Sequence, residues 1–443
     1  MSGETATRRD GNAWCLRNIR YYDSESGQIR LGDIEVVGTR IGAIVKAGTS
    51  GLRPVTHDPN TLCLPGLINA HLHPSKELYG GFSDSASIAS VLDMIHRNYD
   101  VETKEIQKTS SRYSLVRALE TGVTTVGIFS SRAETDAELV ESLGMRAVIH
   151  YCQNDQWVGS GTKPSFDTID SILSRIAACA LRFDSDRITI CPATASERSA
   201  TTSLLSELHG LAASWKRRFA IHVHEGATQV AACREHFART GIALLRDLSL
   251  LDEHCLLVHA CCLSPDDLDV LMGSAASVVH CPVGNSFVGA GKLPLARLIR
   301  SRPIGLGTDA AIVNPVNHLP FEGLFALYFH GEADLSDKVS ARDIFDMMTA
   351  QGARALGLDD VGAIKPGFQA DFGLYRCPWL KEPGRIAALT VLQTLLLERP
   401  CTVVVGGSVL VGREGIRSLS RGDEEFFQAQ HLVKRAADAG YAG

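Results

Sequence analysis

The 443-residue sequence lacks the features that mark several broad classes of protein. It has no basic surplus: 44 Lys and Arg stand against 50 Asp and Glu, and the net charge of −6 disfavours binding to a nucleic-acid backbone. It has no run of 18 uninterrupted apolar residues, which argues against a membrane span. Residues 1–10 are polar and lack the apolar segment of a secretory signal. We therefore expect a cytoplasmic protein that acts on a small molecule.

The twelve cysteines form no C-x-x-C pair and follow no repeated spacing. In a chain of this length a hydrophobic core is sufficient for stability, so a disulfide framework is not required. We expect most of these cysteines to be reduced, buried thiols that pack as small hydrophobic side chains.

The central part of the chain, residues 61–364, alternates between apolar strand candidates and helical patterns. The strand candidates are Leu62–Ile68, Val123–Phe129, Arg146–Tyr151, Ile188–Cys191, Phe219–Val223, Leu256–Val258, Ser277–His280 and Ile304–Leu306. Strict alternation implies parallel strands, and eight such units predict an α/β fold of the (β/α)8 TIM-barrel type. An open doubly wound sheet is the alternative, but no strand precedes the G-x-G-x-x-G turn of a dinucleotide site.

The two ends of the chain have a different, strand-rich texture. Short β-branched runs and turns occupy residues 13–45 and return at 370–411. They predict a small β-sandwich domain that is built from both ends, residues 1–60 and 365–418. The remaining residues, 419–443, are expected to form an amphipathic helix that docks on the barrel or on a partner subunit.

Histidines and one aspartate follow the strands at the ends that would share one face of a barrel. His71 and His73 are two residues apart, so an extended backbone directs both imidazoles to the same side. Further residues of this kind at strand ends are His222, His224, His259, His280 and Asp309. Because active sites lie at the carboxyl ends of barrel strands, we expect these side chains to surround one cavity. Imidazole and carboxylate donors suit Zn²⁺ and similar ions, although any one of these histidines alone could be a structural residue.

The same motifs resemble those of the amidohydrolase superfamily, most closely its branch of triazine hydrolases and of purine, pyrimidine and guanine deaminases. The matching segments are LPGLINAHLH (64–73), GVTTV (122–126), IHVHE (221–225), LVH (257–259), GLGTD (305–309) and GFQAD (367–371). The resemblance covers nearly the whole chain. It implies a hydrolase that attacks a C–N bond with metal-activated hydroxide, and it implies a homodimer or a higher homo-oligomer.

The resemblance also implies roles for individual residues. The implied ligands of one divalent metal ion, Zn²⁺ or Fe²⁺, are His71, His73, His222 and Asp309. Glu225 would move a proton from the attacking water to the leaving group, and Asp309 would be catalytic as well as a ligand. His259 would hydrogen-bond the attacking hydroxide or the developing oxyanion. Binuclear relatives have a bridging lysine after the fourth strand, but residues 188–197 contain none, which favours one metal ion.

The segments that contact the substrate in this family diverge from its usual pattern. Residues 191–193 read Cys-Pro-Ala where many adenine-type deaminases have Gly-Pro-His, and residues 76–82 replace a tryptophan-containing loop. The candidate substrate-binding residues are His224, Asn285, Glu77 and His280. His224 could instead hydrogen-bond to a neighbouring strand. Glu77 could be a solvated loop residue, and His280 could be a buried structural residue.

Hydrolytic deamination of an amino-substituted N-heterocycle is the expected reaction, because the pairing of His222 with Glu225 belongs to that group of relatives. The same centre could instead cleave an N-acyl or aminoacyl amide, or displace another leaving group such as chloride from a ring. A binding or scaffold protein with a vestigial site is a third alternative, which the intact set of site residues disfavours.

Overall fold

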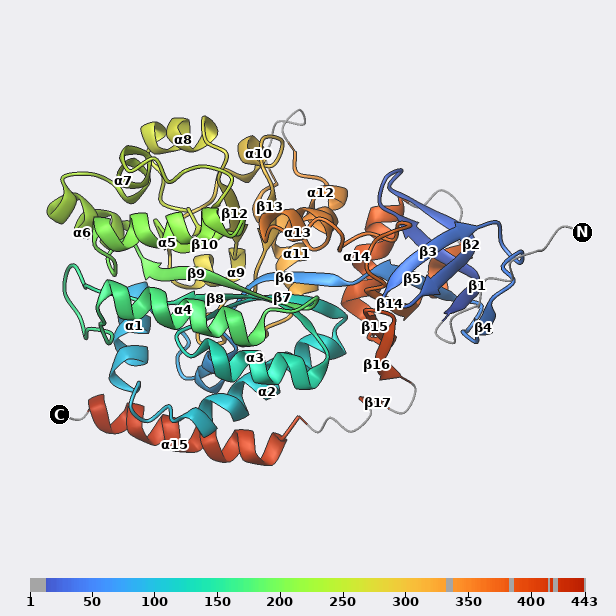
Figure 1. Cartoon of the computed structure of the whole chain (residues 1–443), viewed down its shortest axis with the longest axis horizontal. Helices are drawn as coiled ribbons and strands as arrows, with labels where there is room; N and C mark the ends of the chain where they lie inside the picture. Colours follow the sequence, from blue (N-terminus) through green and yellow to red (C-terminus); the bar gives the residue numbers. More distant parts are fainter. Residues whose placement is uncertain (1–12, 332–337, 382–385, 413–414, 417–420, 442–443) are drawn as a thin grey trace, which may run out of the picture.

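The computed structural model describes residues 13–331, 338–381, 386–412, 415–416 and 421–441 (Figure 1). The polar segment 1–12 lies outside the described residues. The described strands form two sheets, one with eight strands and one with nine. In Figure 1 the eight-stranded sheet and its helices occupy the left and centre, and the nine-stranded sheet lies on the right.

The eight-stranded sheet is the predicted barrel. Its strands are β6 (Leu67–Leu72), β7 (Val123–Ser130), β8 (Arg146–Cys152), β9 (Ile188–Ser196), β10 (Phe219–Val223), β11 (Cys255–His259), β12 (Ser277–His280) and β13 (Ile304–Leu306). Neighbouring strands follow the order of the sequence, and every pairing is parallel. A parallel bridge between Leu72 and Asp309 brings the first strand to the segment after the last, so that the sheet nearly closes. The predicted fold class is confirmed.

Helices follow the barrel strands and cover the outside of the sheet (Figure 1). They are α2 (Lys104–Glu120), α3 (Ala133–Leu143), α4 (Ile169–Phe183), α5 (Thr202–Ser214), α6 (Ala227–Phe237), α7 (Gly241–Asp247), α8 (Pro265–Met272), α9 (Pro282–Phe287), α10 (Leu295–Leu298), α11 (Leu319–Phe329), α12 (Ala341–Met347) and α13 (Ala350–Ala355). Helix α4 illustrates why they form. Thr168 caps its first turn, and Ile172, Ile176 and Cys179 recur at helical spacing on its buried face.

The first strand candidate, Leu62–Ile68, is divided between the two sheets. Its first part is β5 (Thr61–Pro65), which belongs to the nine-stranded sheet, and its second part begins β6. The break falls at Gly66, where a Cβ atom would lie 2.1 Å from Oγ1 of Thr124, so that only glycine fits. The prediction of one strand was wrong. Pro65-Gly66, a dipeptide typical of turns, interrupts the run, but both parts are fully buried, so their composition does not show that they belong to different sheets.

The nine-stranded sheet combines strands from both ends of the chain. Besides β5 it contains β1 (Ala13–Asp23), β2 (Gln28–Val37), β3 (Arg40–Val45), β4 (Arg53–Val55), β14 (Phe372–Arg376), β15 (Pro400–Val405), β16 (Ser408–Gly412) and β17 (Gly415–Ile416). The two ends meet where β14 pairs with β5 in antiparallel register. A buried ion pair of 2.8 Å between Arg146 of β8 and Asp371, just before β14, ties this sheet to the barrel.

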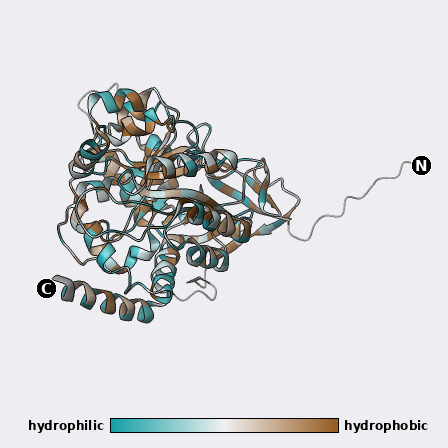
Figure 2. Ribbon diagram, turned by 60° about the vertical axis from the view of Figure 1, so that its left-hand side comes forward, coloured by the Kyte–Doolittle hydropathy of each residue, from teal (hydrophilic) through white to brown (hydrophobic). Residues whose placement is uncertain are grey.

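The C-terminal helix α15 (Asp423–Tyr441) lies along the outside of the barrel (Figure 1). It packs against α2, the short helix η1 (Pro74–Tyr79) and α1 (Ile88–Arg97). The ring of Phe426 stacks on that of Tyr113, with centroids 3.8 Å apart. Figure 2 shows both hydrophobic and hydrophilic segments along this helix, in keeping with its predicted amphipathic character.

The described residues include all twelve cysteines; none of the twelve is in a disulfide, and ten of them are buried, as the sequence predicted. Their thiols therefore contribute as small hydrophobic groups in the core. Among the described residues, no helix combines the length and the apolar character that crossing a membrane would need.

Candidate metal centre and cavity

Three imidazoles and one carboxylate meet at the carboxyl end of the barrel. The Nε2 atoms of His71, in β6, and His222, in β10, lie 3.2 Å apart. Oδ1 of Asp309 lies 3.7 Å from Nε2 of His71 and 3.5 Å from Nε2 of His73. Donors bound at 2.0–2.1 Å to a tetrahedral Zn²⁺ ion lie about 3.3 Å apart. These three separations are close to that value, and the donor types suit a divalent ion. His71, His73 and Asp309 form one group whose donor atoms lie within 4.8 Å of one another, and His71, His222 and His259 form a second such group.

Hydrogen bonds determine which ring nitrogen of two histidines faces the site. Nδ1 of His222 lies 2.6 Å from the carbonyl oxygen of Ala195, to which it donates, so Nε2 keeps its lone pair. Nδ1 of His259 donates to Oδ1 of Asn285 at 2.7 Å, while the amide nitrogen of Asn285 donates to Sγ of Cys261. Nε2 of His259 is buried and has no hydrogen-bond partner among the described residues. It is thus an available acceptor beside the donor cluster.

Burial controls the protonation of these groups. Desolvation lowers the pKa of His71 and His73 well below the usual value and lowers the pKa of His259 to about 3. These imidazoles are therefore neutral and can offer a lone pair. Desolvation acts in the opposite direction on Glu225: together with the charge of Asp309 it raises the pKa of this carboxyl well above its usual value.

Glu225 lies directly after the turn that ends β10. Its Oε1 is 3.4 Å from Nε2 of His259, and its backbone N–H donates to Oε1 of Gln229. The chain reaches this position through His224, which has a φ of 52°. Left-handed residues also occur at the end of β11, at His259, and after β13, at Asp309. A left-handed backbone conformation is costly for residues other than glycine, and such residues are concentrated at functional sites.

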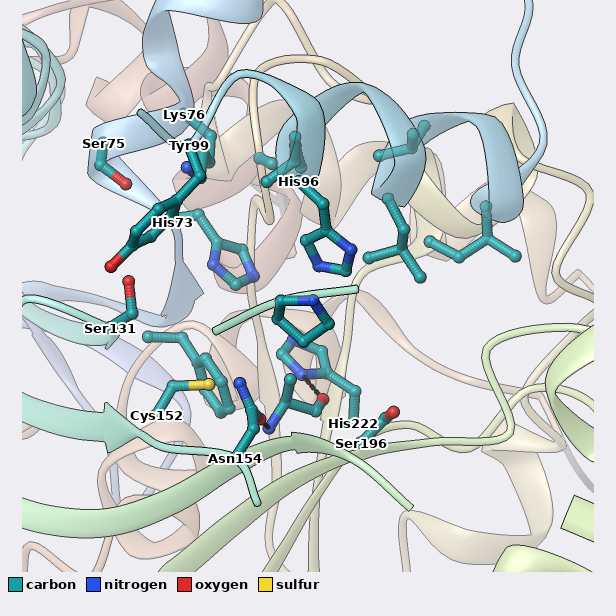
Figure 3. Close-up of a pocket in the computed structure, with 18 of the residues that line it drawn as sticks. His73, Ser75, Lys76, His96, Tyr99, Ser131, Cys152, Asn154, Ser196 and His222 are labelled. Carbon is teal, nitrogen blue, oxygen red and sulfur yellow. Dashed lines mark hydrogen bonds between the residues drawn. The ribbon is translucent and has the colours of Figure 1, made fainter. Parts of the chain in front are cut away.

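A cavity of about 400 Å³ extends from the donor cluster, which is a size typical of small-molecule sites. Its inner wall includes His73, His222, Glu225 and Asp309. Its opposite wall is the apolar face of α1, formed by Ile88, Val91, Leu92 and Ile95. Polar groups from α1, from the segment after it and from the residues at or after the strand ends complete the lining. Among them are His96, Tyr99, Ser131, Asn154 and Ser196 (Figure 3).

Helix α1 is bonded across the cavity to the loop that follows β8. The backbone N–H and Oγ1 of Thr162 both donate to Oδ1 of Asp93, at 3.1 and 2.5 Å. In return, Nδ1 of His96 donates to the carbonyl oxygen of Thr162 at 2.6 Å, and the His96 ring contacts Trp157 edge-on. These bonds hold α1 in place as one wall of the cavity.

Residues 62–399 match the model of the amidohydrolase family. The chain belongs to the amidohydrolase family. It is accordingly a metal-dependent hydrolase, and the donor cluster lies where the barrel strands of this amidohydrolase end.

Individual proteins resemble this amidohydrolase over nearly its whole length. It is 25% identical over 404 residues to a 5-methylthioadenosine/S-adenosylhomocysteine deaminase of Thermococcus onnurineus (strain NA1), an alignment that covers 90% of this chain and 94% of the relative. It superposes on a triazine hydrolase from Arthobacter aurescens with a TM-score of 0.85 at 19% identity, covering 96% and 99% of the two chains. It superposes on an adenosine deaminase from Xanthomonas campestris with bound zinc at a TM-score of 0.82 and 20% identity, covering 96% and 98%.

The structure does not bring every predicted site residue of the amidohydrolase to the cavity. Nδ1 of His224 donates to the carbonyl oxygen of Cys262, and Nε2 accepts from the N–H of Ile242. Both ring nitrogens of His224 are thus used to join the segment after β11 to the first turn of α7. His280 points elsewhere as well, because its Nε2 lies 2.9 Å from Nε2 of His330.

Glu77 and Asn285 are also outside the cavity lining among the described residues. The buried Glu77 carboxylate forms an ion pair of 2.6 Å with the half-buried Arg117 and accepts a hydrogen bond from Asn317. It lies in η1, which turns its side chain toward α2 instead of toward the donor cluster. Asn285 contacts the site through His259, because its Oδ1 accepts the hydrogen bond from Nδ1 of that ring.

The α1 wall and the loop after β8 were not among the predicted parts of the site. Their cavity residues, which include His96, Tyr99, Asn154 and Trp157, do not follow a strand end in a recognisable motif. The available signal was the spacing of Ile88, Val91, Leu92 and Ile95, which is that of an amphipathic helix.

Proposed function

We propose that this amidohydrolase releases ammonia from an amino-substituted N-heterocycle by hydrolysis. The observation that carries the proposal is the position of Glu225, a buried carboxyl with a raised pKa beside His259 and at the wall of the donor-lined cavity. A buried carboxyl whose pKa is raised binds a proton more readily than an exposed one, which suits it to accept and return a proton in general acid–base catalysis. The names of two similar proteins, the deaminases of Thermococcus onnurineus and Xanthomonas campestris, support the same reaction class.

We propose further that one divalent ion, Zn²⁺ or Fe²⁺, is held by His71, His73, His222 and Asp309. The separations of their donor atoms and the neutral state of the buried imidazoles support this ligand set. The absence of lysine from β9 supports a single ion. When bound, such an ion lowers the pKa of water from 15.7 to about 7 and so makes a nucleophile available at neutral pH.

The protein's own residues then move the protons. A carboxylate oxygen of Glu225 accepts a proton from the attacking water and transfers it to the leaving amino nitrogen as the C–O bond forms and the C–N bond breaks. Nε2 of His259 accepts a hydrogen bond from the attacking water, because Nδ1 already carries the proton that is donated to Asn285. The products are ammonia and the oxo-substituted heterocycle.

Displacement of a different leaving group from a ring is the second candidate reaction. The likeness to a triazine hydrolase favours it, since the same proton transfers would assist loss of another group. Cleavage of an N-acyl or aminoacyl amide would use the same residues but would release an amine and a carboxylic acid.

The test is a product assay with the metal-loaded enzyme on aminopurines, aminopyrimidines, triazines and N-acyl amino acids. Ammonia formed in equal amount to an oxo-heterocycle would support deamination. Release of a carboxylic acid, or of chloride without ammonia, would contradict it in favour of the corresponding alternative. Metal analysis of the same preparation is expected to give about one equivalent per chain.

A further inference from the structure

Two polar side chains of the cavity lining are held in fixed orientations, although neither belongs to the donor cluster. They are His96 of α1 and Asn154, which follows β8. In Figure 3 the ring of His96 points from α1 into the cavity, and Asn154 lies on the side of the strand ends. Each bonds to the backbone through one polar atom of its side chain, which leaves the other polar atom for a ligand.

The amide of Asn154 presents a hydrogen-bond donor to the cavity. Its Oδ1 accepts from the backbone N–H of Ala195 at 3.2 Å and from Oγ1 of Thr194 at 3.3 Å. Because a backbone N–H only donates, the branch that accepts from it is the oxygen, and the other branch is the NH2 group. Nδ2 forms no hydrogen bond within the part of the chain that the structure describes. The carbonyl oxygen of Ala195 accepts from Nδ1 of His222, so this NH2 group lies beside a proposed metal ligand.

The ring of His96 presents a hydrogen-bond acceptor. Its Nδ1 lies 2.6 Å from the carbonyl oxygen of Thr162, which only accepts, so Nδ1 carries the proton. Burial lowers the pKa of His96, and the ring is therefore neutral at pH 7 with a lone pair on Nε2. Nε2 has no hydrogen-bond partner among the described residues. The ring also packs edge-on against Trp157, with centroids 5.1 Å apart, which restricts its rotation.

The lining offers little charge for recognition of a charged substrate. Besides Glu225 and the proposed metal ligands, the charged residues that line the cavity are Lys76, Asp100 and Lys163. Lys76 forms an ion pair of 2.5 Å with the buried Glu102, while Asp100 and Lys163 are exposed to solvent. An anionic group inside the cavity would therefore find no unpaired cation among these side chains. The lining favours a neutral molecule that is recognised by hydrogen bonds.

We propose that His96 and Asn154 select the substrate, and that this substrate is a neutral amino-heterocycle with both a hydrogen-bond acceptor and a donor. A pyridine-type ring nitrogen accepts from Nδ2 of Asn154, and a ring N–H or a hydroxyl on another edge donates to Nε2 of His96. Aromatic N-heterocycles carry both kinds of atom in one flat ring, whereas the carboxylate of an N-acyl amino acid needs a cation beside it. This inference rests on the proposed function, because it concerns the substrate of the same site.

Such a pair discriminates because an unpaired polar atom in a closed cavity is unfavourable. A ligand that lacks the matching atom displaces water from Nδ2 of Asn154 or Nε2 of His96 and forms no hydrogen bond in its place. We expect the loss of one of these hydrogen bonds to weaken binding about 10–100-fold.

The test is calorimetric titration of metal-loaded Glu225→Gln, in which slow turnover allows binding to be measured alone. The ligands are adenine and cytosine, with analogues that lack one hydrogen-bonding atom each. 3-Deazaadenine, 7-deazaadenine and 3-deazacytosine lack a ring acceptor, and 9-methyladenine and 1-methylcytosine lack the ring N–H. In at least one of the two series, we expect a deaza analogue and the methyl analogue to bind more weakly than the parent by the factor given above.

One further substitution at a time, in the same Glu225→Gln protein, separates ligand recognition from local structure. His96→Asn keeps an N–H for the bond to Thr162 but has no atom at the place of Nε2, so it should bind the methyl analogue and its parent with nearly equal affinity. Asn154→Asp keeps the oxygen that accepts from Ala195 but has no NH2 group, so it should lose the preference for the parent over the deaza analogue.

Two controls distinguish this selection from a general effect on the cavity. Ser160→Ala, at an exposed position of the loop after β8, should leave every ratio of affinities unchanged. Thr162→Val, which removes a bond to Asp93 of α1, should weaken all ligands alike and so also leave the ratios unchanged. If Asn154→Asp does not fold, Asn154→Ser provides the same comparison of ratios.

Either of two results would overturn the proposal. One is that neither parent heterocycle binds, and the other is that His96→Asn and Asn154→Asp retain the discrimination shown without them. Failure of the proposed function has a different signature, because the wild-type enzyme would then bind and discriminate these heterocycles without releasing ammonia. Conversely, ammonia release from parents, deaza analogues and methyl analogues at equal efficiency would retain deamination and remove this selection.

Discussion

At the scale of single residues, Glu225 is the group whose removal separates proton transfer from metal binding. Glu225→Gln keeps the size and hydrogen bonding of the side chain but cannot accept a proton. We expect turnover to fall by a factor of about 10²–10⁴, the usual contribution of general acid–base catalysis. Metal content should remain that of the wild type, whereas His71→Ala should lose both metal and activity. Steady-state kinetics with metal analysis tests this, and undiminished turnover of Glu225→Gln would remove the proton shuttle.

Asn285 is a positioning residue, because it acts on the site by holding the His259 ring with Nδ1 protonated. Asn285→Leu removes the acceptor and should lower kcat about 10–100-fold with little change in KM, as for other residues that orient an active-site histidine. Asn285→Asp restores an acceptor and should recover part of the activity. If the Asp and Leu variants were equally impaired, packing of the side chain, and not its hydrogen bond to Nδ1, would be the cause.

At the scale of elements, the bond between Asp93 of α1 and Thr162 controls how well α1 closes the cavity. Thr162→Val removes the hydroxyl that donates to the Asp93 carboxylate while preserving the shape of the side chain. Loss of a hydrogen bond to a charged group costs about 1.5 kcal/mol or more, so we expect KM to rise about tenfold with kcat unchanged. Ser160→Ala, at an exposed position of the same loop, is the control. An unchanged KM for Thr162→Val would show that closure of α1 does not contribute to substrate binding.

Helix α12 contains a carboxyl whose titration affects stability. Burial raises the pKa of Asp346 to about 6, above the usual 3.8. The folded protein therefore binds this proton more tightly than the unfolded chain does, and the free energy of unfolding falls as the pH rises from about 4 to 6. Asp346→Asn should increase the free energy of unfolding by about 1–2 kcal/mol at pH 7.5, after screening by solvent, and should have little effect at pH 4.

Asp343 of the same helix provides the opposite case. Burial opposes ionisation of Asp343, but hydrogen bonds from Arg300 and Ser340 outweigh it and hold its pKa below the usual value. Asp343→Asn should therefore destabilise the protein at pH 7.5 and have a smaller effect at low pH. Urea unfolding at the two pH values measures both variants. A pH-independent gain in Asp346→Asn would assign its effect to packing instead of titration.

At the scale of the whole molecule, the sequence predicted what depends on local pattern and on topology. Alternating strands and helices indicated the barrel, and its topology then placed His71, His222 and Asp309 at one end of it, where the structure brings their donor atoms together. The features that the sequence did not predict depend on the direction of individual side chains. His224 follows its strand through a left-handed turn that directs the ring away from the cavity, and the alternation of residues along a strand contains no signal for that turn.

The division of the Leu62–Ile68 run and the position of α1 were missed for a related reason. Pro65-Gly66 marks a break between β5 and β6, but two equally buried apolar segments do not show that they belong to different sheets. Helix α1 shows an amphipathic pattern, but such a pattern does not specify whether its apolar face covers a core or a ligand cavity. Both features are determined by contacts between segments that are far apart in the chain.

The proposed metal ligands come from the first, fifth and eighth strands of the barrel or from the residues that follow them, so a bound ion would link the beginning of the barrel to its end. Removal of the ion by a chelator should lower the midpoint of thermal unfolding, because an ion at a hundred times its dissociation constant stabilises the folded state by about 2.7 kcal/mol. Added Zn²⁺ should restore the midpoint in the wild type. His222→Ala should show the lower midpoint with or without Zn²⁺, whereas Glu225→Gln should respond as the wild type does. Scanning calorimetry distinguishes these cases, and an equal response of His222→Ala to Zn²⁺ would place the ion outside this donor set.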